Sequence, residues 1–113
     1  METRTSGAEA PEGYDPSDYP AFAVTVDVVI LTMDEGTLKV LLVRRGGAPF
    51  AGMWAIPGGF KRPAETLDEA ARRELVEETA VDTAGLLTQF GAYGDPDRDP
   101  RMNVVTVAYL AVL

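Results

Sequence analysis

Apolar and polar residues alternate along the stretch from Phe22 to Leu31. One face carries Val24, Val26, Val28 and Ile30, and the other carries Thr25, Asp27, Val29 and Leu31. A period of two is typical of a β-strand, in which successive side chains point to opposite faces. The pattern therefore predicts a strand that begins near Phe22.

Three further apolar segments have strand character. Leu38 to Val43 follows the turn-forming residues Asp34-Glu35-Gly36, so it should form a hairpin with the first strand. Leu86 to Tyr93 and Val104 to Leu113 flank the polar loop Gly94 to Arg101. The chain stops inside the last of these runs, and we expect the C-terminal part of the domain to be missing.

A loop and a helix should lie between the predicted strands Leu38 to Val43 and Leu86 to Tyr93. Gly46 to Gly59 is rich in glycine and contains two prolines, which predicts an irregular loop. Thr66-Leu67-Asp68-Glu69 has the spacing of a capping box, with Pro63 upstream. Because no Gly or Pro follows as far as Thr79, the sequence predicts a helix from Thr66 to Thr79.

The composition indicates one small domain. The chain has 113 residues, of which 46% are hydrophobic and 25% charged, enough for a single modest core. We assign this domain to residues 21–113 and expect residues 1–20, rich in Gly, Pro, Ser, Asp and Glu, to form a flexible tail. No apolar run approaches the roughly 20 residues of a membrane span, and no signal core follows Met1, so we expect a cytoplasmic protein without membrane contacts.

The charged residues limit the chemistry. Without cysteine or histidine, disulfides, thiolate metal sites and imidazole bases are excluded. Eighteen acidic and ten basic residues give a net charge of −8, which opposes direct nucleic-acid binding by this chain because such binding depends on neutralising phosphates. A phosphate-bearing small molecule would need a cation as intermediary.

The predicted helix carries an unusual acidic stripe. At 100° per residue, one face contains Leu67, Ala70, Ala71, Glu74 and Glu78, with Leu75 and Glu77 at its margins. The carboxylates repel one another and the negative end of the helix dipole. Arg73 has the spacing to pair with Glu69 or Glu77, but one guanidinium cannot neutralise the whole cluster.

A divalent cation could neutralise these carboxylates. Mg²⁺ or Mn²⁺ prefers hard oxygen ligands and keeps coordination sites open for water and phosphates, which favours phosphoanhydride cleavage. The alternative is a solvated charged face, the usual explanation for a Glu-rich helix. The small Ala70 and Ala71 on the same stripe argue against that alternative.

The order of residues around this stripe resembles the Nudix box. Gly59, five residues, Glu65, seven residues and then Arg73-Glu74-Leu75-Val76-Glu77-Glu78-Thr79-Ala80-Val81 match every defining position except one. The resemblance implies an α/β fold, the Nudix α/β/α sandwich with a mixed β-sheet. The mismatch is Ala80, where the family has Gly. If this position is left-handed, alanine costs of order 1 kcal/mol.

The resemblance also implies roles for individual residues. Glu74, Glu77 and Glu78 would hold the metal, together with a backbone carbonyl of Gly58 or Gly59. Glu65 and Arg73 would orient the cluster, and Glu74 is an alternative candidate for the base. The implied reaction is attack of a metal-activated water on a pyrophosphate link.

Two segments outside the box narrow the comparison. Phe50 to Phe60 and Asp95 to Arg101 resemble both bacterial ADP-ribose pyrophosphatase-like proteins and the Nudix-like domain of transcriptional regulators of NAD metabolism. The nearly complete box favours a hydrolase that converts ADP-ribose, or a related nucleoside diphosphate derivative, into AMP and a sugar phosphate. The alternatives are a ligand-sensing domain of such a regulator and a non-catalytic assembly partner. The exposed terminal strand and the resemblance both favour a homodimer.

Four arginines are candidates for contacts with substrate phosphates. Arg44 and Arg45 end the second predicted strand, and Arg98 and Arg101 lie in the polar loop. Gly58 is a further candidate because its backbone can approach a phosphate. The competing interpretations are a solubilising strand end for Arg44 and Arg45 and a loop held by local Asp–Arg pairs for Arg98 and Arg101. Trp54 is expected to pack in the core rather than to stack on a base.

Overall fold

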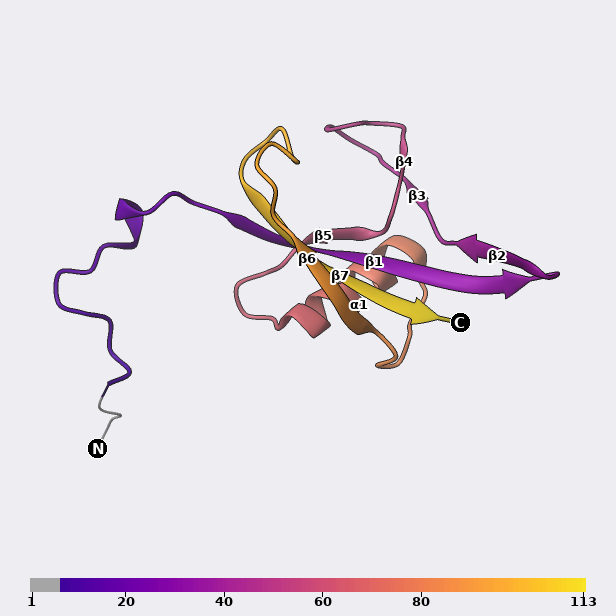
Figure 1. Cartoon of the computed structure of the whole chain (residues 1–113), viewed down its shortest axis with the longest axis horizontal. Helices are drawn as coiled ribbons and strands as arrows, with labels where there is room; N and C mark the ends of the chain where they lie inside the picture. Colours follow the sequence, from indigo (N-terminus) through magenta and orange to yellow (C-terminus); the bar gives the residue numbers. More distant parts are fainter. Residues whose placement is uncertain (1–6) are drawn as a thin grey trace.

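The computed structural model describes residues 7–113, so the first six residues of the predicted tail lie outside the described part. A five-stranded sheet is formed by β1 (Ala23–Asp34), β2 (Thr37–Val40), β5 (Gly58–Phe60), β6 (Thr88–Tyr93) and β7 (Val104–Val112) (Figure 1). The strand order is β2-β1-β7-β6, and β5 pairs with β1 on the edge that β2 also uses. β1 and β7 are parallel and the other pairs are antiparallel, so the predicted α/β class with a mixed sheet is confirmed.

The helix α1 (Leu67–Thr79) covers one face of this sheet. The core beneath it consists of the buried residues Val26, Val28, Ile30, Ala70, Ala71, Leu75, Tyr109 and Ala111. The alternation predicted for β1 is present: Val26, Val28 and Ile30 share the face that packs on the core, whereas Val24 on the same face is exposed. Alanines at two of the contact positions let the helix backbone approach the strands closely, which brings the residues at the end of β5 next to α1.

Both ends of α1 have the local structure that the sequence predicts. Thr66 Oγ1 accepts a hydrogen bond from the Glu69 backbone N–H at 3.1 Å, and Glu69 Oε1 accepts one from the Thr66 N–H at 2.8 Å. Beyond Thr79, Ala80 is left-handed, with φ 63° and ψ 11°, and its N–H bonds to the carbonyl of Val76. The helix and its capping box are confirmed, and Ala80 occupies the conformation that glycine adopts most readily.

The predicted strand from Leu38 to Val43 is wrong as a single element. β2 ends at Val40, and β3 (Val43–Arg44) pairs with β4 (Trp54–Ala55) in a separate two-stranded sheet. Between them Leu41 packs partly buried against the core, and its N–H bonds to the carbonyl of Ile30 at 3.0 Å. Burial of this leucine turns the chain away from β1, and the chain leaves the main sheet at that point.

The prediction of an irregular loop from Gly46 to Gly59 is also wrong, because β4 and the start of β5 lie within it. At Gly58 an added Cβ would lie 2.2 Å from the backbone oxygen of Val26, and at Gly59 it would lie 1.9 Å from Glu74 Oε2. The two glycines are thus needed for close packing of a strand between β1 and α1. Glycine at these positions therefore indicates that neighbouring elements approach the strand closely, and not that the backbone is irregular.

Residues 7–22 extend away from the sheet as an arm (Figure 1). All of them are exposed, and the arm contains the short 3-10 helix η1 (Pro16–Asp18). Tyr14 and Tyr19 stack on each other with ring centroids 5.7 Å apart. No helix among residues 7–113 has the length and apolar character needed to cross a lipid bilayer.

Candidate functional site

The strand β5 separates two regions of opposite charge. On the α1 side lie the predicted acidic residues Glu65, Glu74, Glu77 and Glu78 together with Arg73. On the other side, arginines line a cavity between the β3–β4 segment and the loop between β6 and β7. We call these regions the acidic cluster and the arginine pocket. Gly58 and Gly59 lie between them.

Arg73 is at the centre of the acidic cluster. Its guanidinium donates to Glu65 through Nε at 2.9 Å and through Nη2 at 2.6 Å, and Nη1 contacts Glu74. Glu77 is further away, 3.4 Å from Nη1. The side chains of Arg73, Glu65 and Glu74 are only 16%, 13% and 14% exposed. Of the two partners that the helix spacing allows for Arg73, Glu77 is within ion-pair distance, whereas Glu69 is used in the helix cap. The orienting role of Arg73 and Glu65 stays a prediction.

The acidic cluster shifts the pKa of its members in opposite directions. Hydrogen bonding to Arg73 lowers the pKa of Glu65 to about 2. Burial, followed by the neighbouring Glu74, raises the pKa of Glu78 to about 7, although the Gly58 N–H donates to Glu78 Oε2 at 3.2 Å. Arg73 therefore neutralises one end of the cluster and leaves carboxylates crowded at the other end.

The donor set fits a hard divalent cation. Carboxylate oxygens are ligands that Mg²⁺ and Mn²⁺ prefer, and a cation would relieve the crowding that raises the pKa of Glu78. In the part of the chain from residue 7 onward, no three acidic side chains converge closely enough to enclose a metal ion. Glu74 is engaged by Arg73, and Glu78 by the backbone of Gly58, so metal binding would require these side chains to rearrange.

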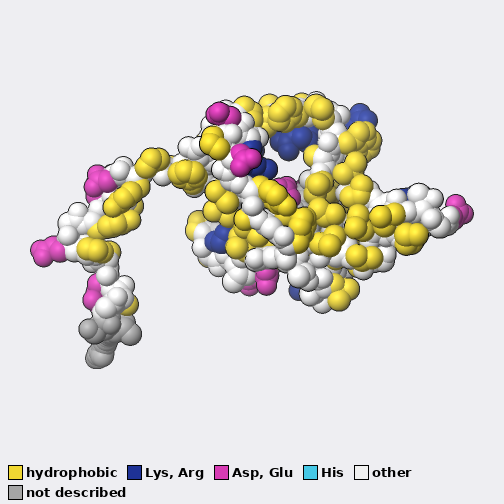
Figure 2. Space-filling view, viewed as in Figure 1, with side chains coloured by type: hydrophobic (Ala, Val, Ile, Leu, Met, Phe, Trp, Pro, Cys, Tyr) yellow, Lys and Arg dark blue, Asp and Glu magenta, His cyan; other side chains and the backbone are white. Residues whose placement is uncertain are grey.

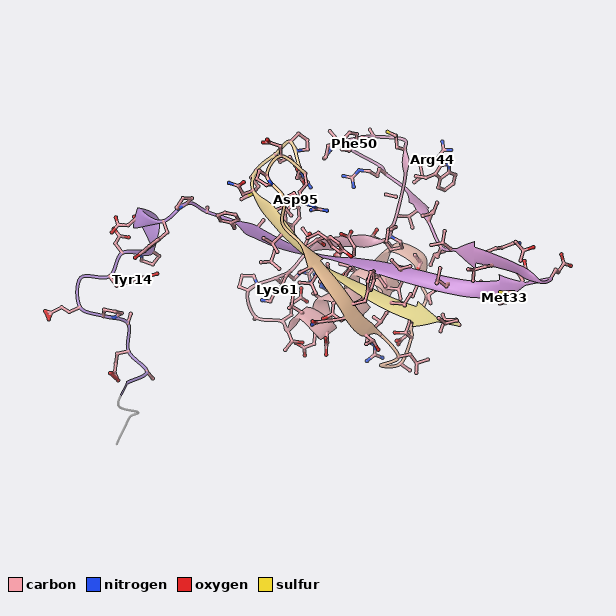
Figure 3. All side chains as sticks on the ribbon, viewed as in Figure 1. Tyr14, Met33, Arg44, Phe50, Lys61 and Asp95 are labelled. Atoms are coloured by element: carbon pink, nitrogen blue, oxygen red, sulfur yellow. The ribbon has the colours of Figure 1, made fainter. Side chains whose placement is uncertain are left out.

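The arginine pocket collects most of the predicted phosphate-binding residues. Arg45, Arg98, Arg101 and Gly58 line a cavity of about 190 Å³, together with Asp27 and the aromatic residues Phe50 and Phe60. In Figure 2, basic side chains gather in the hollow between the β3–β4 segment and the loop that joins β6 to β7. Figure 3 shows Phe50 on one of these segments and Asp95 on the other, with the opening between them.

Arg44 lies in a neighbouring cavity. This second cavity, of about 320 Å³, is lined by Arg44 and Glu78 and shares Arg45, Ile56 and Gly58 with the arginine pocket. The two cavities therefore adjoin each other at these shared residues. Small-molecule sites commonly measure ~300–1,000 Å³.

The pocket arginines differ in how far they are already engaged. Arg101 binds Asp99 through two hydrogen bonds of 3.0 and 2.8 Å and stacks over Phe60, with its guanidinium carbon 4.9 Å from the ring centroid. The local Asp–Arg pair expected as an alternative is thus present at Arg101. Arg45 donates to the Pro49 carbonyl, and neither Arg45 nor Arg98 has a carboxylate within ion-pair distance in residues 7–113.

The prediction that Trp54 packs in the core is wrong. Its side chain belongs to β4 and is 62% exposed, and Arg44 lies over its ring at 4.8 Å from the centroid. The physical reason is that β3 and β4 form a separate sheet away from the core, so a tryptophan there covers only its partner strand. The aromatic ring and Arg44 stabilise this projecting segment through a cation–π contact.

Sequence reasoning overlooked Asp27 and Thr106. Asp27 lines the arginine pocket from the middle of β1, and its Oδ2 accepts a 2.6 Å hydrogen bond from the buried Thr106. A carboxylate in a strand that is otherwise mostly apolar was the available signal. The pairing with Thr106, 79 residues later, could not be read from the sequence because it depends on the parallel register of β1 and β7.

The chain is similar to proteins that act on or respond to ADP-ribose. It is 40% identical to the ADPR responsive transcriptional repressor NtrR of Acinetobacter baylyi over 88% of this chain and 40% of the repressor. It is 41% identical to the ADP-ribose pyrophosphatase of Methanocaldococcus jannaschii over 78% of this chain and 49% of the enzyme. The chain therefore spans less than half the length of these two relatives.

The chain is also similar to a solved structure of a domain bound to ADP ribose. The NUDIX domain of Shewanella oneidensis NrtR, complexed with ADP ribose, superposes with a TM-score of 0.81 at 41% identity, covering 89% of this chain and 66% of that chain. The NUDIX domain profile matches residues 21–113, which include the whole sheet, α1 and the acidic cluster. This chain therefore belongs to the Nudix family.

Proposed function

We propose that this domain binds ADP-ribose, or a closely related nucleoside diphosphate derivative, and serves as the ligand-sensing part of a transcriptional regulator. The observation that carries the proposal is the arginine pocket beside Gly58. Arg45 and Arg98 line this cavity and form no ion pair in the described residues, so their charges are available to bind a diphosphate.

The relatives support the regulatory reading. Similarity to an ADPR responsive repressor extends over 88% of this chain, and the structural match is to a NUDIX domain complexed with ADP ribose. Both relatives are longer than the region matched here. A ligand bound across the two cavities would contact α1, the β3–β4 segment and the β6–β7 loop at once, and binding could therefore be transmitted to another part of a regulator.

A second candidate is metal-dependent hydrolysis of the same ligand, which the retained carboxylates favour. Glu74, Glu77 and Glu78 would hold Mg²⁺ or Mn²⁺, and the ion would supply an activated water and neutralise charge on the leaving phosphate. Arg73 and Glu65 would keep Glu74 in position through their buried contacts. Arg44 and Arg45 would hold the diphosphate on the side of Glu78.

One experiment separates the two candidates. Binding of ADP-ribose is measured by calorimetry, and AMP release with Mg²⁺ by chromatography, for the wild-type chain and for Glu77→Gln. Glu12→Gln, in the exposed arm, is the matched control. The sensor proposal predicts saturable binding without AMP release, and binding that Glu77→Gln retains.

The other outcomes are equally informative. AMP release that Glu77→Gln loses and Glu12→Gln keeps would establish the hydrolase and displace the sensor proposal for this domain. Absence of binding to the metal-replete wild-type chain would overturn both candidates, because each requires the domain to bind the diphosphate.

A further inference from the structure

Asp27 is a carboxylate in the lining of the arginine pocket, and its Oδ1 accepts no hydrogen bond from residues 7–113. It lies on the face of β1 opposite the core, and its neighbours Val26 and Val28 are fully buried on the other face. Thr106 donates to Oδ2 at 2.6 Å and so fixes the carboxylate. Across residues 7–113, no lysine or arginine lies within 4.0 Å of Asp27 to form an ion pair.

A single residue separates Asp27 from the acidic cluster. Asp27 is directly opposite Gly58 in the pairing of β1 with β5, and a Cβ on Gly58 would lie 2.8 Å from Asp27 Oδ1. On its other side, the N–H of the same glycine donates to Glu78 at 3.2 Å. A ligand diphosphate held at Gly58 would therefore be adjacent to Asp27.

The chemistry of a carboxylate defines what Asp27 can bind. An ionised carboxylate accepts hydrogen bonds and donates none, so its partner on the ligand must be a hydroxyl or an amine. It repels phosphate, whereas Arg45 and Arg98 in the same pocket attract it. In a nucleoside diphosphate the sugar is bonded to the phosphate and the base lies beyond the sugar, so the nearest donor to the diphosphate is a sugar hydroxyl.

We propose that Asp27, held by Thr106, accepts a hydrogen bond from a ribose hydroxyl of the ligand and thereby makes the site selective for ligands that carry this hydroxyl. This inference rests on the proposed function, because it assumes that a diphosphate occupies the arginine pocket. Thr106 acts as a positioning residue, since its hydroxyl donates to Asp27 and holds the carboxylate in place.

The test compares ligands that differ in single hydroxyls. Calorimetry with ADP, 2′-deoxy-ADP, 3′-deoxy-ADP and ADP-ribose is performed on the wild-type chain, Asp27→Ala and Asp27→Asn. Asp95→Asn, in the exposed part of the β6–β7 loop, is the control. Loss of a hydrogen bond to a charged group weakens binding about tenfold to a hundredfold. Asp27→Ala should therefore weaken binding of ribose ligands by that factor, and Asp27→Asn by less.

The pattern across ligands decides the proposal. If Asp27 contacts the nucleoside ribose, one deoxy form of ADP binds the wild-type chain weakly and loses nothing further in Asp27→Ala. If it contacts the second ribose, ADP-ribose is weakened and ADP is unchanged. Equal weakening of all four ligands, or unchanged binding of all four, would overturn the assignment while leaving the proposed function intact.

Two further measurements keep the test decisive. Urea unfolding of the ligand-free variants identifies any loss of folded protein, and Asp27→Asn, which keeps the shape of the side chain, replaces Asp27→Ala if the alanine variant is unfolded. Thr106→Val should reproduce the same ligand selectivity with a smaller loss of affinity. A wild-type chain that binds none of the four ligands would instead overturn the proposed function, and this assignment with it.

Discussion

The two sides of β5 differ in how their charges are satisfied. In the acidic cluster, Arg73 is enclosed by Glu65 and Glu74, and all three side chains are mostly buried. In the arginine pocket, Arg45 and Arg98 have no carboxylate partner within residues 7–113. Removing one member of a buried charge pair leaves its partner uncompensated and destabilises the fold, whereas charges outside ion pairs at a cavity can bind a ligand. Substitutions on the two sides should therefore affect different properties.

The largest effect is expected at the centre of the acidic cluster. Replacing Arg73 by Met leaves Glu65 and Glu74 buried without their cation, and breaking a buried pair in this way typically costs about 3–5 kcal/mol of the free energy of unfolding. Urea unfolding measures this cost. Arg72→Met is the matched control, because Arg72 pairs with Asp82 on the surface, where ion pairs are worth only about 0–1 kcal/mol. Similar costs for the two variants would remove the distinction between a buried cluster and a surface pair.

The second prediction concerns the arginine pocket. Arg45→Ala and Arg98→Ala should each weaken ADP-ribose binding about tenfold to a hundredfold, because each removes a charged hydrogen-bond donor from the diphosphate. The free energy of unfolding should change by less than about 1 kcal/mol, since neither residue is in an ion pair. Calorimetry and urea unfolding measure the two effects, with Arg72→Ala as the control. Unaltered affinity in both variants would exclude the pocket as the diphosphate site.

The acidic side was largely predictable from the sequence and the basic side was not. Residues Arg73 to Glu78 lie on one helix, so their spacing determines their relative positions, and the capping box at Thr66 determines where the helix begins. The contact between Arg73 and Glu65 spans only eight residues. Local periodicity is sufficient for such a cluster because few tertiary contacts are needed to assemble it.

The arginine pocket is assembled from segments distant in the sequence. Arg45, Arg98 and Asp27 come from three elements, and their approach depends on the departure of the chain from β1 after Leu41 and on the register of β1 with β7. Neither of these two features can be predicted from the periodicity of apolar residues in the sequence. The error at Trp54 has the same origin, because an aromatic residue in an apolar stretch indicates burial only if its strand belongs to the main sheet.

A smaller effect should come from the end of α1. Ala80 has φ 63°, a conformation in which alanine is strained, so Ala80→Gly should raise the free energy of unfolding by about 1 kcal/mol. The affinity for ADP-ribose should be unchanged, because Ala80 lines neither cavity. Urea unfolding and calorimetry measure these two quantities. A glycine variant that is less stable than the wild type would show that loss of chain entropy outweighs relief of strain at this position.

The smallest effect is a pH dependence of stability that arises from Glu78. Its pKa in the folded chain is about 7, above the ordinary value of 4.5, so the folded state holds this proton more tightly than the unfolded state. The contribution is fully present below about pH 4.5 and is lost as the pH rises to 7. Glu78→Gln should remove this slope, measured as urea midpoints between pH 4.5 and 7.

Two features limit the effect and make it separable from others. Glu78 is only partly shielded from solvent, so solvent screening reduces its contribution. The carboxyls of Glu65, Asp82 and Asp99 have pKa values of about 2, and their contributions are lost only as the pH falls from their ordinary values towards 2. These changes occur at lower pH than the change caused by Glu78. The dependence of the free energy of unfolding on pH between 4.5 and 7 therefore reports on Glu78, at the crowded end of the acidic cluster. An identical slope in Glu78→Gln would mean that neither burial nor the neighbouring Glu74 and Glu77 raises the pKa of this carboxyl.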